Sequence, residues 1–137
     1  MAQQSGGHEP VYLTLEDVLE LFATIIGGTR ADAANQLRSA DALEGALARP
    51  ATHAHYQNAD LALQAAILAH GIAESQPFID GNKRAALVAM LTFLEINGTR
   101  LQATDPELAA WIIDLSARAS PDQLAETIRR AAQTANE

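Results

Sequence analysis

Residues 76–84 read Gln-Pro-Phe-Ile-Asp-Gly-Asn-Lys-Arg, and residues 85–96 follow directly as Ala-Ala-Leu-Val-Ala-Met-Leu-Thr-Phe-Leu-Glu-Ile. The second stretch is apolar on nearly every side, which predicts a helix surrounded by protein. Asn97 and Gly98 should end it, because glycine readily adopts the left-handed conformation that closes many helices. We therefore expect a fold organised around a buried central helix that begins at this polar segment.

The amino end of that helix has a composition typical of anion binding. Free backbone amides and the helix dipole favour an anion there, most often a phosphate. Lys83 and Arg84 add two positive charges, which would cost stability at this end unless an anion bound nearby. Asp80 lies one turn away and could hold a Mg²⁺ ion that bridges phosphate oxygens. The residues themselves predict a nucleotide-phosphate cradle.

Length and composition indicate one small helical domain. The chain has 137 residues, of which 48% are hydrophobic and only 4% aromatic, so the core must be mostly aliphatic. We expect an all-α domain over residues 11–133, preceded by a mobile tail over residues 1–10. There is no cysteine, which excludes disulfides and thiolate metal sites.

The net charge of −8 argues against direct nucleic-acid binding, which needs a basic face. No apolar run approaches the roughly 18 residues that a membrane span requires, and the first residues lack the order of a secretory signal. We expect a cytoplasmic protein with neither membrane nor nucleic acid as a partner. An acidic surface can simply serve solubility, but Lys83 and Arg84 form a local positive island in it.

The other helices are predicted from apolar residues at helical spacing behind residues that cap helix starts. The expected caps are Thr14, Ser39, Asp60, Asp105 and Ser120. Residues 29–38 are interpreted as a polar connection. Arg49 and Pro50 should break the helix that Ser39 begins, so residues 50–58 are expected to be extended chain or a small hairpin.

Several single residues have a structural and a functional interpretation. His53 and His55 would share one face of a strand, but they have no evident third metal ligand, and exposed loop histidines are favoured. His70 is interpreted as a core or interface histidine with a satisfied hydrogen bond. Phe78 is expected to anchor its loop in the core, and Trp111 is also expected in the core.

Residues 76–84 resemble the signature of the Fic/Doc family, His-x-Phe-x-Asp/Glu-Gly/Ala-Asn-x-Arg, in which x stands for any residue. The resemblance is best to the Doc branch, in which Asn-Lys-Arg follows and a later motif arginine is missing; here that position is Leu87. The family histidine falls on Gln76. In the family that histidine deprotonates the target hydroxyl, whereas glutamine cannot take up a proton near neutral pH.

The resemblance implies a small helical bundle with a short flap, possibly a β-hairpin, that holds the target. We place this flap at residues 50–58. Doc-type toxins transfer the terminal phosphate of ATP to a protein hydroxyl, with elongation factor Tu as the best-known target, and a partner antitoxin holds them inactive. Fic enzymes more commonly transfer AMP instead.

The resemblance also implies roles for single residues. Asp80 would bind Mg²⁺, and Gly81 and Asn82 would donate hydrogen bonds to phosphate. Lys83 and Arg84 would neutralise charge during transfer, and Gln76 would occupy the position of the base. Loss of a base typically costs about 100- to 10,000-fold in rate, so the chain is expected to be impaired.

The sequence leaves other functions open. The chain could be a Fic-type AMP transferase, although Leu87 in place of an arginine argues against that. It could be a regulatory pseudoenzyme that binds nucleotide without chemistry, or a helical scaffold in which this loop is only a turn. Gln76 fits either a natural residue or a deliberate replacement of histidine in a toxic protein.

Overall fold

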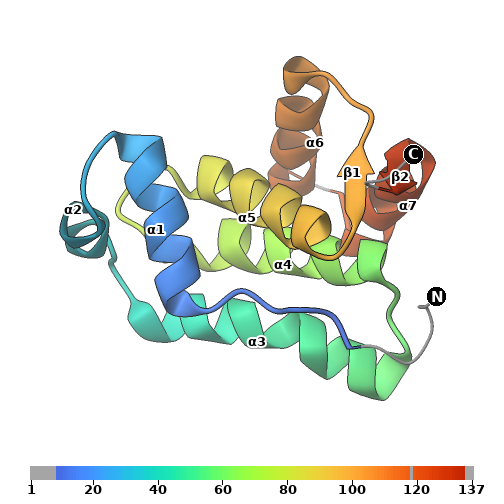
Figure 1. Ribbon diagram of the computed structural model, residues 1–137, viewed down its shortest axis with the longest axis horizontal. Coiled ribbons are helices and arrows are strands. Elements are labelled where there is room, and N and C mark those ends of the chain that lie inside the picture. The colour runs from blue at the N-terminus through green and yellow to red at the C-terminus, as the bar shows by residue number, and fades with distance from the viewer. Residues whose placement is uncertain (1–8, 118, 135–137) are drawn as a thin grey trace.

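The computed structural model describes residues 9–117 and 119–134, and the expected tail over residues 1–10 lies almost entirely outside this part of the chain. Within it the elements follow in the order α1 (Leu15–Ile26), α2 (Arg30–Asn35), α3 (Ala40–Gln57), α4 (Leu61–Ser75), α5 (Asn82–Ile96), β1 (Thr99–Leu101), α6 (Asp105–Ala117), α7 (Pro121–Ala131) and β2 (Ala132–Thr134) (Figure 1). The two short strands pair antiparallel, with Leu101 opposite Ala132. The all-α prediction is confirmed.

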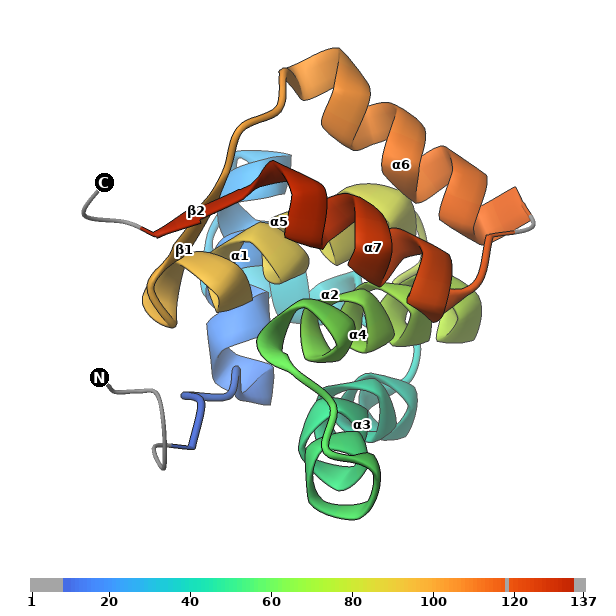
Figure 2. The same cartoon turned by 90° about the vertical axis from the view of Figure 1, so that its right-hand side faces the viewer.

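Helices α4 and α5 run through the middle of the molecule and contact each other along their length. Helix α3 packs against one side of α4 and α7 against another, so α4 lies between them (Figure 2). Helix α1 crosses α5, and α6 contacts both central helices. No helix in the described ranges is long and apolar enough to cross a bilayer.

The most buried helix is α4, although the sequence predicted this for α5. Small side chains let the neighbours of α4 approach closely, and its buried residues are Ala62, Gln64, Ala65, Ala66, Ile67, Leu68, Ala69, Gly71 and Ile72. Helix α5 buries one side, including Met90 and Phe93, but leaves Leu87 and Leu91 half-buried. The prediction of a central helix after residue 84 is therefore right in position and overstated in burial.

Four of the five expected helix caps are confirmed. The side chains of Thr14, Ser39, Asp60 and Ser120 each accept a hydrogen bond from a backbone amide in the first turn that follows. At α6 the cap is Thr104 instead of Asp105, because Thr104 and Glu107 bond each other's backbone amides in a capping box. Trp111, expected in the core, is only partly buried.

The prediction for residues 50–58 is wrong. Helix α3 continues through Pro50 to Gln57 and ends at Asn58, which has a left-handed φ of 53°. Pro50 is fully buried, so packing against the core outweighs the hydrogen bond that proline removes from the helix. His53 and His55 therefore lie on a helix, where the His53 ring contacts Gln57 Oε1 at 2.8 Å, and this segment forms no flap.

Helix α2 was also missed by the sequence analysis, which interpreted residues 29–38 as a connection. Thr29 and Asp32 form a capping box that starts this six-residue helix, with Thr29 N donating to Asp32 Oδ2 at 2.8 Å. A helix this short has too few apolar positions to show a periodic pattern. Its one buried residue, Ala33, packs in the core beside α1.

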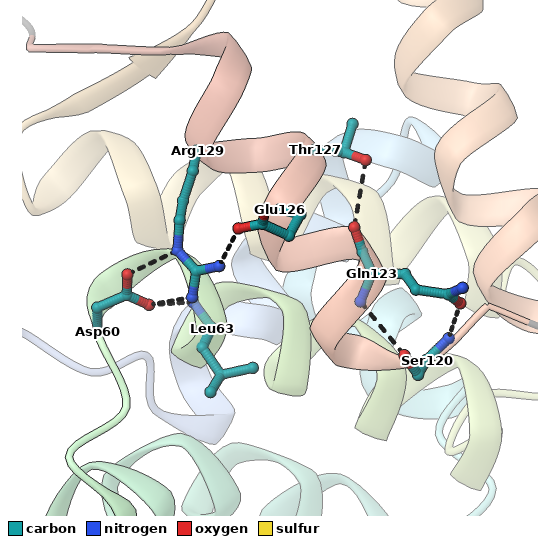
Figure 3. Close-up of polar contacts among 7 residues, drawn as sticks. All are labelled: Asp60, Leu63, Ser120, Gln123, Glu126, Thr127 and Arg129. Carbon is teal, nitrogen blue, oxygen red and sulfur yellow. Dashed lines mark hydrogen bonds and ion pairs between the residues drawn. The ribbon is translucent and has the colours of Figure 1, made fainter.

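An ion pair fastens α7 to the start of α4 (Figure 3). The guanidinium of Arg129 donates to both carboxylate oxygens of Asp60, at 2.8 and 3.0 Å, and to Glu126 at 2.7 Å. Asp60 also caps α4 by accepting from Leu63 N at 2.9 Å. The Arg129 hydrogen bond holds the pKa of the Asp60 carboxyl below its ordinary value. One carboxylate thus serves both a helix cap and an interhelical contact.

Replacing Asp60 should therefore lower the free energy of unfolding by an amount that depends on pH. Asp60→Ala removes the cap and the ion pair and should lower the free energy of unfolding by about 1–2 kcal/mol. Asp60→Asn keeps a cap and should lose only about 0–1 kcal/mol, because the pair is half-exposed. Since folding lowers the pKa of Asp60, the advantage of the natural chain over the Asp60→Asn variant exists above about pH 4, the unfolded pKa, and disappears as pH falls through the folded pKa. Urea unfolding at several pH values measures it, and a constant difference down to pH 2 would contradict this account.

Two glycines test the close approach of α3 and α4. A Cβ at Gly71 would lie 3.1 Å from Ala46 Cβ, and Ala46 has no flexible end that could move away. Gly71→Ala should lower the free energy of unfolding by about 1–3 kcal/mol, because the helices must separate. A Cβ at Gly45 would meet nothing, so Gly45→Ala on exposed α3 surface should raise it by about 0.5–1 kcal/mol. Thermal or urea unfolding compares the two, and the same sign for both would refute the packing argument.

Candidate functional site

A cavity of about 680 Å³ lies where α4 ends and α5 begins, with one wall residue, Leu115, supplied by α6. Cavities of this size are typical of small-molecule sites. Its walls are formed by the last turns of α4, the loop that follows and the first turn of α5, through His70, Ala73, Glu74, Gln76, Ile79, Asp80, Gly81, Asn82, Lys83, Arg84 and Leu115. All six residues that the sequence singled out line this one cavity.

The loop between α4 and α5 is closed by the side chain of Asn82. Its Oδ1 accepts from Phe78 N at 2.9 Å, and its Nδ2 donates to Phe78 O at 3.0 Å. Phe78 is fully buried and stacks on Phe22 of α1, with ring centroids 3.9 Å apart. The expected core anchor is confirmed. The Asn82 side chain, expected to donate to phosphate, instead has one amide hydrogen and its oxygen engaged in holding the loop.

The first backbone amides of α5 have no cap from any described side chain. Gly81 precedes the helix with a left-handed φ of 81° and no side chain to offer. Its own amide donates to Asp80 Oδ1 at 2.8 Å, and the amides of residues 82–84 are too early in the helix to have intrahelical acceptors. The helix therefore presents an uncapped, electropositive end to the cavity.

Lys83 and Arg84 add formal charge to this end of the cavity. Both side chains are exposed, and neither forms an ion pair with an acidic residue in the described part of the chain. The arginines that do pair with carboxylates there lie on other helices, as Arg30 and Arg129 do. The charges of Lys83 and Arg84 are thus not neutralised from within the site.

Gln76 ends α4 in an unusual backbone conformation. Its φ is 48°, a left-handed value that non-glycine residues rarely adopt and that costs about 1–2 kcal/mol. Its amide donates to Ile72 O at 3.1 Å, and its carbonyl accepts from the guanidinium of Arg38. Both bonds use the backbone, and no hydrogen bond joins the Gln76 side chain to another residue in the described part of the chain. The backbone conformation therefore sets where this side chain lies.

The extended segment beside this loop comes from residues 36–38, directly after α2. Arg38 N donates to Pro77 O at 2.7 Å, Ile79 N donates to Gln36 O at 2.8 Å, and Leu37 and Phe78 form an antiparallel bridge. This segment, and not residues 50–58, is the strand-like element at the site. Its pairing is between segments about 40 residues apart, so no local sequence pattern indicated it.

His70 was predicted to be a core or interface histidine, and it lies in the wall of the cavity and not in the core. Its side chain is 31% exposed, and Nε2 lies 3.9 Å from Oε2 of Glu74, one turn further along α4. The other Glu74 oxygen is 3.7 Å from Arg49 of α3. The spacing of His70, Ala73 and Glu74 at i, i+3 and i+4 puts them on one helix face, a signal that the sequence contained.

Comparison with known proteins identifies the family of the chain. The chain matches the Fic/DOC family over residues 12–94, which is more than half of its length. The chain belongs to the Fic/DOC family. It is also 37% identical over 94 residues to Toxin Doc of Mycolicibacterium smegmatis, a match that covers 67% of this chain and 68% of that protein.

The Fic/DOC match covers α1 to α5 almost completely, and so includes the α4–α5 loop and every cavity residue except Leu115. Helices α6 and α7 lie beyond it. The wall that α6 adds is therefore a feature of this chain that the Fic/DOC match does not cover.

Gly81 offers a test of the cavity's geometry. A Cβ there would lie 3.3 Å from Phe22 Cε1 in a left-handed conformation, so Gly81→Ala should displace the start of α5. Any nucleotide phosphate that binds at this helix end should then bind about tenfold more weakly, a difference of about 1.4 kcal/mol that calorimetry would measure. Gly98→Ala is the matched control, because Gly98 has the same left-handed strain, no neighbour within 4 Å and no place in the cavity. Equal losses in both variants would show that strain alone, and not the cavity, is responsible.

Proposed function

We propose that this chain binds ATP with Mg²⁺ at the amino end of α5 and transfers the terminal phosphate to a hydroxyl of a protein. The observation that supports this most is the combination of an uncapped helix end with two unpaired cations, Lys83 and Arg84, on one 680 Å³ cavity. Such an end attracts phosphate, and the cations would cost stability there if no anion were to bind.

The residues present suit both parts of this cofactor. Asp80 uses Oδ1 to accept from Gly81 N, and no described donor occupies Oδ2, so an oxygen ligand for Mg²⁺ remains. The amides of residues 82–84 and the Lys83 and Arg84 side chains supply donors and positive charge for phosphate oxygens. When bound, Mg²⁺ neutralises phosphate charge as it develops during transfer.

Phosphate transfer depends mainly on positioning and charge stabilisation, which these residues can supply. Lys83 and Arg84 lie at the helix end where charge would develop on the transferred phosphate. Gln76 stands where the family has its histidine and cannot accept the proton of the attacking hydroxyl. We therefore propose that transfer is slow in this chain.

The biological role that we propose is that of a toxin in a toxin–antitoxin module. It rests on the 37% identity to a protein named Toxin Doc and on the family signature around residues 76–84. The target would be a translation factor similar to elongation factor Tu, in the cytoplasm, and a partner antitoxin would hold the chain inactive.

A matched pair of chains tests the reaction. Gln76→His restores the family's base and should raise phosphate transfer by about 100- to 10,000-fold. Each chain is incubated with cell extract and ATP labelled on the γ-phosphate, and modified proteins are identified by mass spectrometry. Gln102→His, at an exposed position outside the cavity, controls for adding a histidine. A Gln76→His chain that neither labels a protein nor harms cells on expression would contradict the proposal.

The same experiment separates the alternative functions. Transfer of label from the α-phosphate, and not from the γ-phosphate, would make the chain an AMP transferase. A chain that binds ATP with Mg²⁺ in calorimetry and modifies nothing, even after Gln76→His has restored the base, would be a regulatory nucleotide-binding protein. If the chain bound no ATP, the remaining interpretation would be a helical scaffold in which this loop is only a turn.

A further inference from the structure

We propose that His70 takes over the role of proton acceptor that Gln76 cannot perform. This inference rests on the proposed function, because it concerns the hydroxyl that attacks the phosphate. The inference is based on the position of His70 in the cavity wall. His70 lines the same cavity as Gln76 and the cations of α5, and it is the one histidine among the described wall residues.

The chemistry of the side chain suits this task. Imidazole is the group that most often moves protons in enzymes near neutral pH, and glutamine has no basic atom. A hydroxyl oxygen of the target bonds to the γ-phosphorus, the bond between that phosphorus and the bridging oxygen breaks, and ADP leaves with the electron pair. The hydroxyl proton passes to a ring nitrogen of His70 and from there to water.

The separation of His70 from Gln76 along α4 determines how the proton could reach the imidazole. His70 precedes Gln76 by six positions, which corresponds to about 9 Å along a helix axis. A separation of about 9 Å is too long for a direct hydrogen bond, so the proton of a hydroxyl held near Gln76 would reach the imidazole through a chain of bound water. The His70 side chain is 31% exposed, so solvent can enter and carry the proton away.

A carboxylate behind the imidazole completes the arrangement. Glu74 Oε2 lies 3.9 Å from His70 Nε2, and Glu74 Oε1 lies 3.7 Å from Arg49 Nη1. A base oriented by a third group is the usual organisation of activated proton acceptors. At 3.9 Å this contact is electrostatic and too long for a hydrogen bond, so Glu74 would act as a positioning residue that attracts the imidazolium formed by proton transfer, with Arg49 beside it on α3.

Other charged groups line the same cavity as the imidazole. They are Asp80 in the loop and Lys83 and Arg84 at the start of α5.

The test measures γ-phosphate transfer to extract proteins across a range of pH. His70→Gln should reduce transfer by about 100-fold and remove the fall in rate on the acidic side, with binding of ATP and Mg²⁺ unchanged in calorimetry. Glu74→Gln should reduce transfer less and shift that limb. His55→Gln, the same substitution on exposed α3 surface, should change nothing. Adding Gln76→His to the His70→Gln chain should restore transfer, because the second histidine replaces the first.

The outcomes distinguish this inference from the proposed function. If the natural chain transfers phosphate and His70→Gln leaves the rate unchanged, or only Glu74→Gln reduces it, the role of His70 is refuted. The same holds if the chain is inactive and Gln76→His alone activates it, although the proposed function then stands. If neither chain transfers phosphate, the proposed function fails and the role of His70 fails with it.

Discussion

Two hydrogen bonds between the side chain of Asn82 and the backbone of Phe78 hold the amino end of α5 where it is. They close the loop over Gly81, whose left-handed conformation leaves the helix without a capping side chain. Phe78 continues this connection into the core by stacking on Phe22 of α1. The uncapped end of α5 is therefore a consequence of how the loop folds. This helix end forms the positive wall of the cavity.

The two main walls of the cavity differ in charge. The α5 wall has the helix dipole, Lys83 and Arg84, whereas the α4 wall has Glu74 and His70. With a net charge of −8, the whole protein does not attract anions from a distance, and at physiological salt such fields extend only about 8 Å. An anion bound in this cavity would thus depend on contacts within the site, where Arg49 lies 3.7 Å from Glu74 and reduces the repulsion that Glu74 would exert on it.

The sequence predicted what depends on local chemistry. The caps at Thr14, Ser39, Asp60 and Ser120 and the buried Phe78 follow from short patterns, and the structure confirms them. The sequence analysis failed where contacts between distant segments determine the local structure. Pro50 stays inside α3 because the core packs around it, and residues 36–38 pair with the α4–α5 loop across about 40 residues. The clustering of the six site residues needed only their nearness in sequence, and the helix face shared by His70 and Glu74 could have been read from their spacing, whereas the contribution of α6 needed the fold.

Gln76 shows why fold and activity can separate at this site. The hydrogen bonds described for it join its amide to Ile72 and its carbonyl to Arg38, so the strained turn is held entirely through the backbone. A side chain at this position can then change without loss of the turn, and histidine and glutamine would be held in the same place. The fold preserves the position of a base whether or not a base occupies it. In the reaction that we propose, proton transfer is thus the one step that the backbone does not determine, and side chains around the cavity would have to supply it.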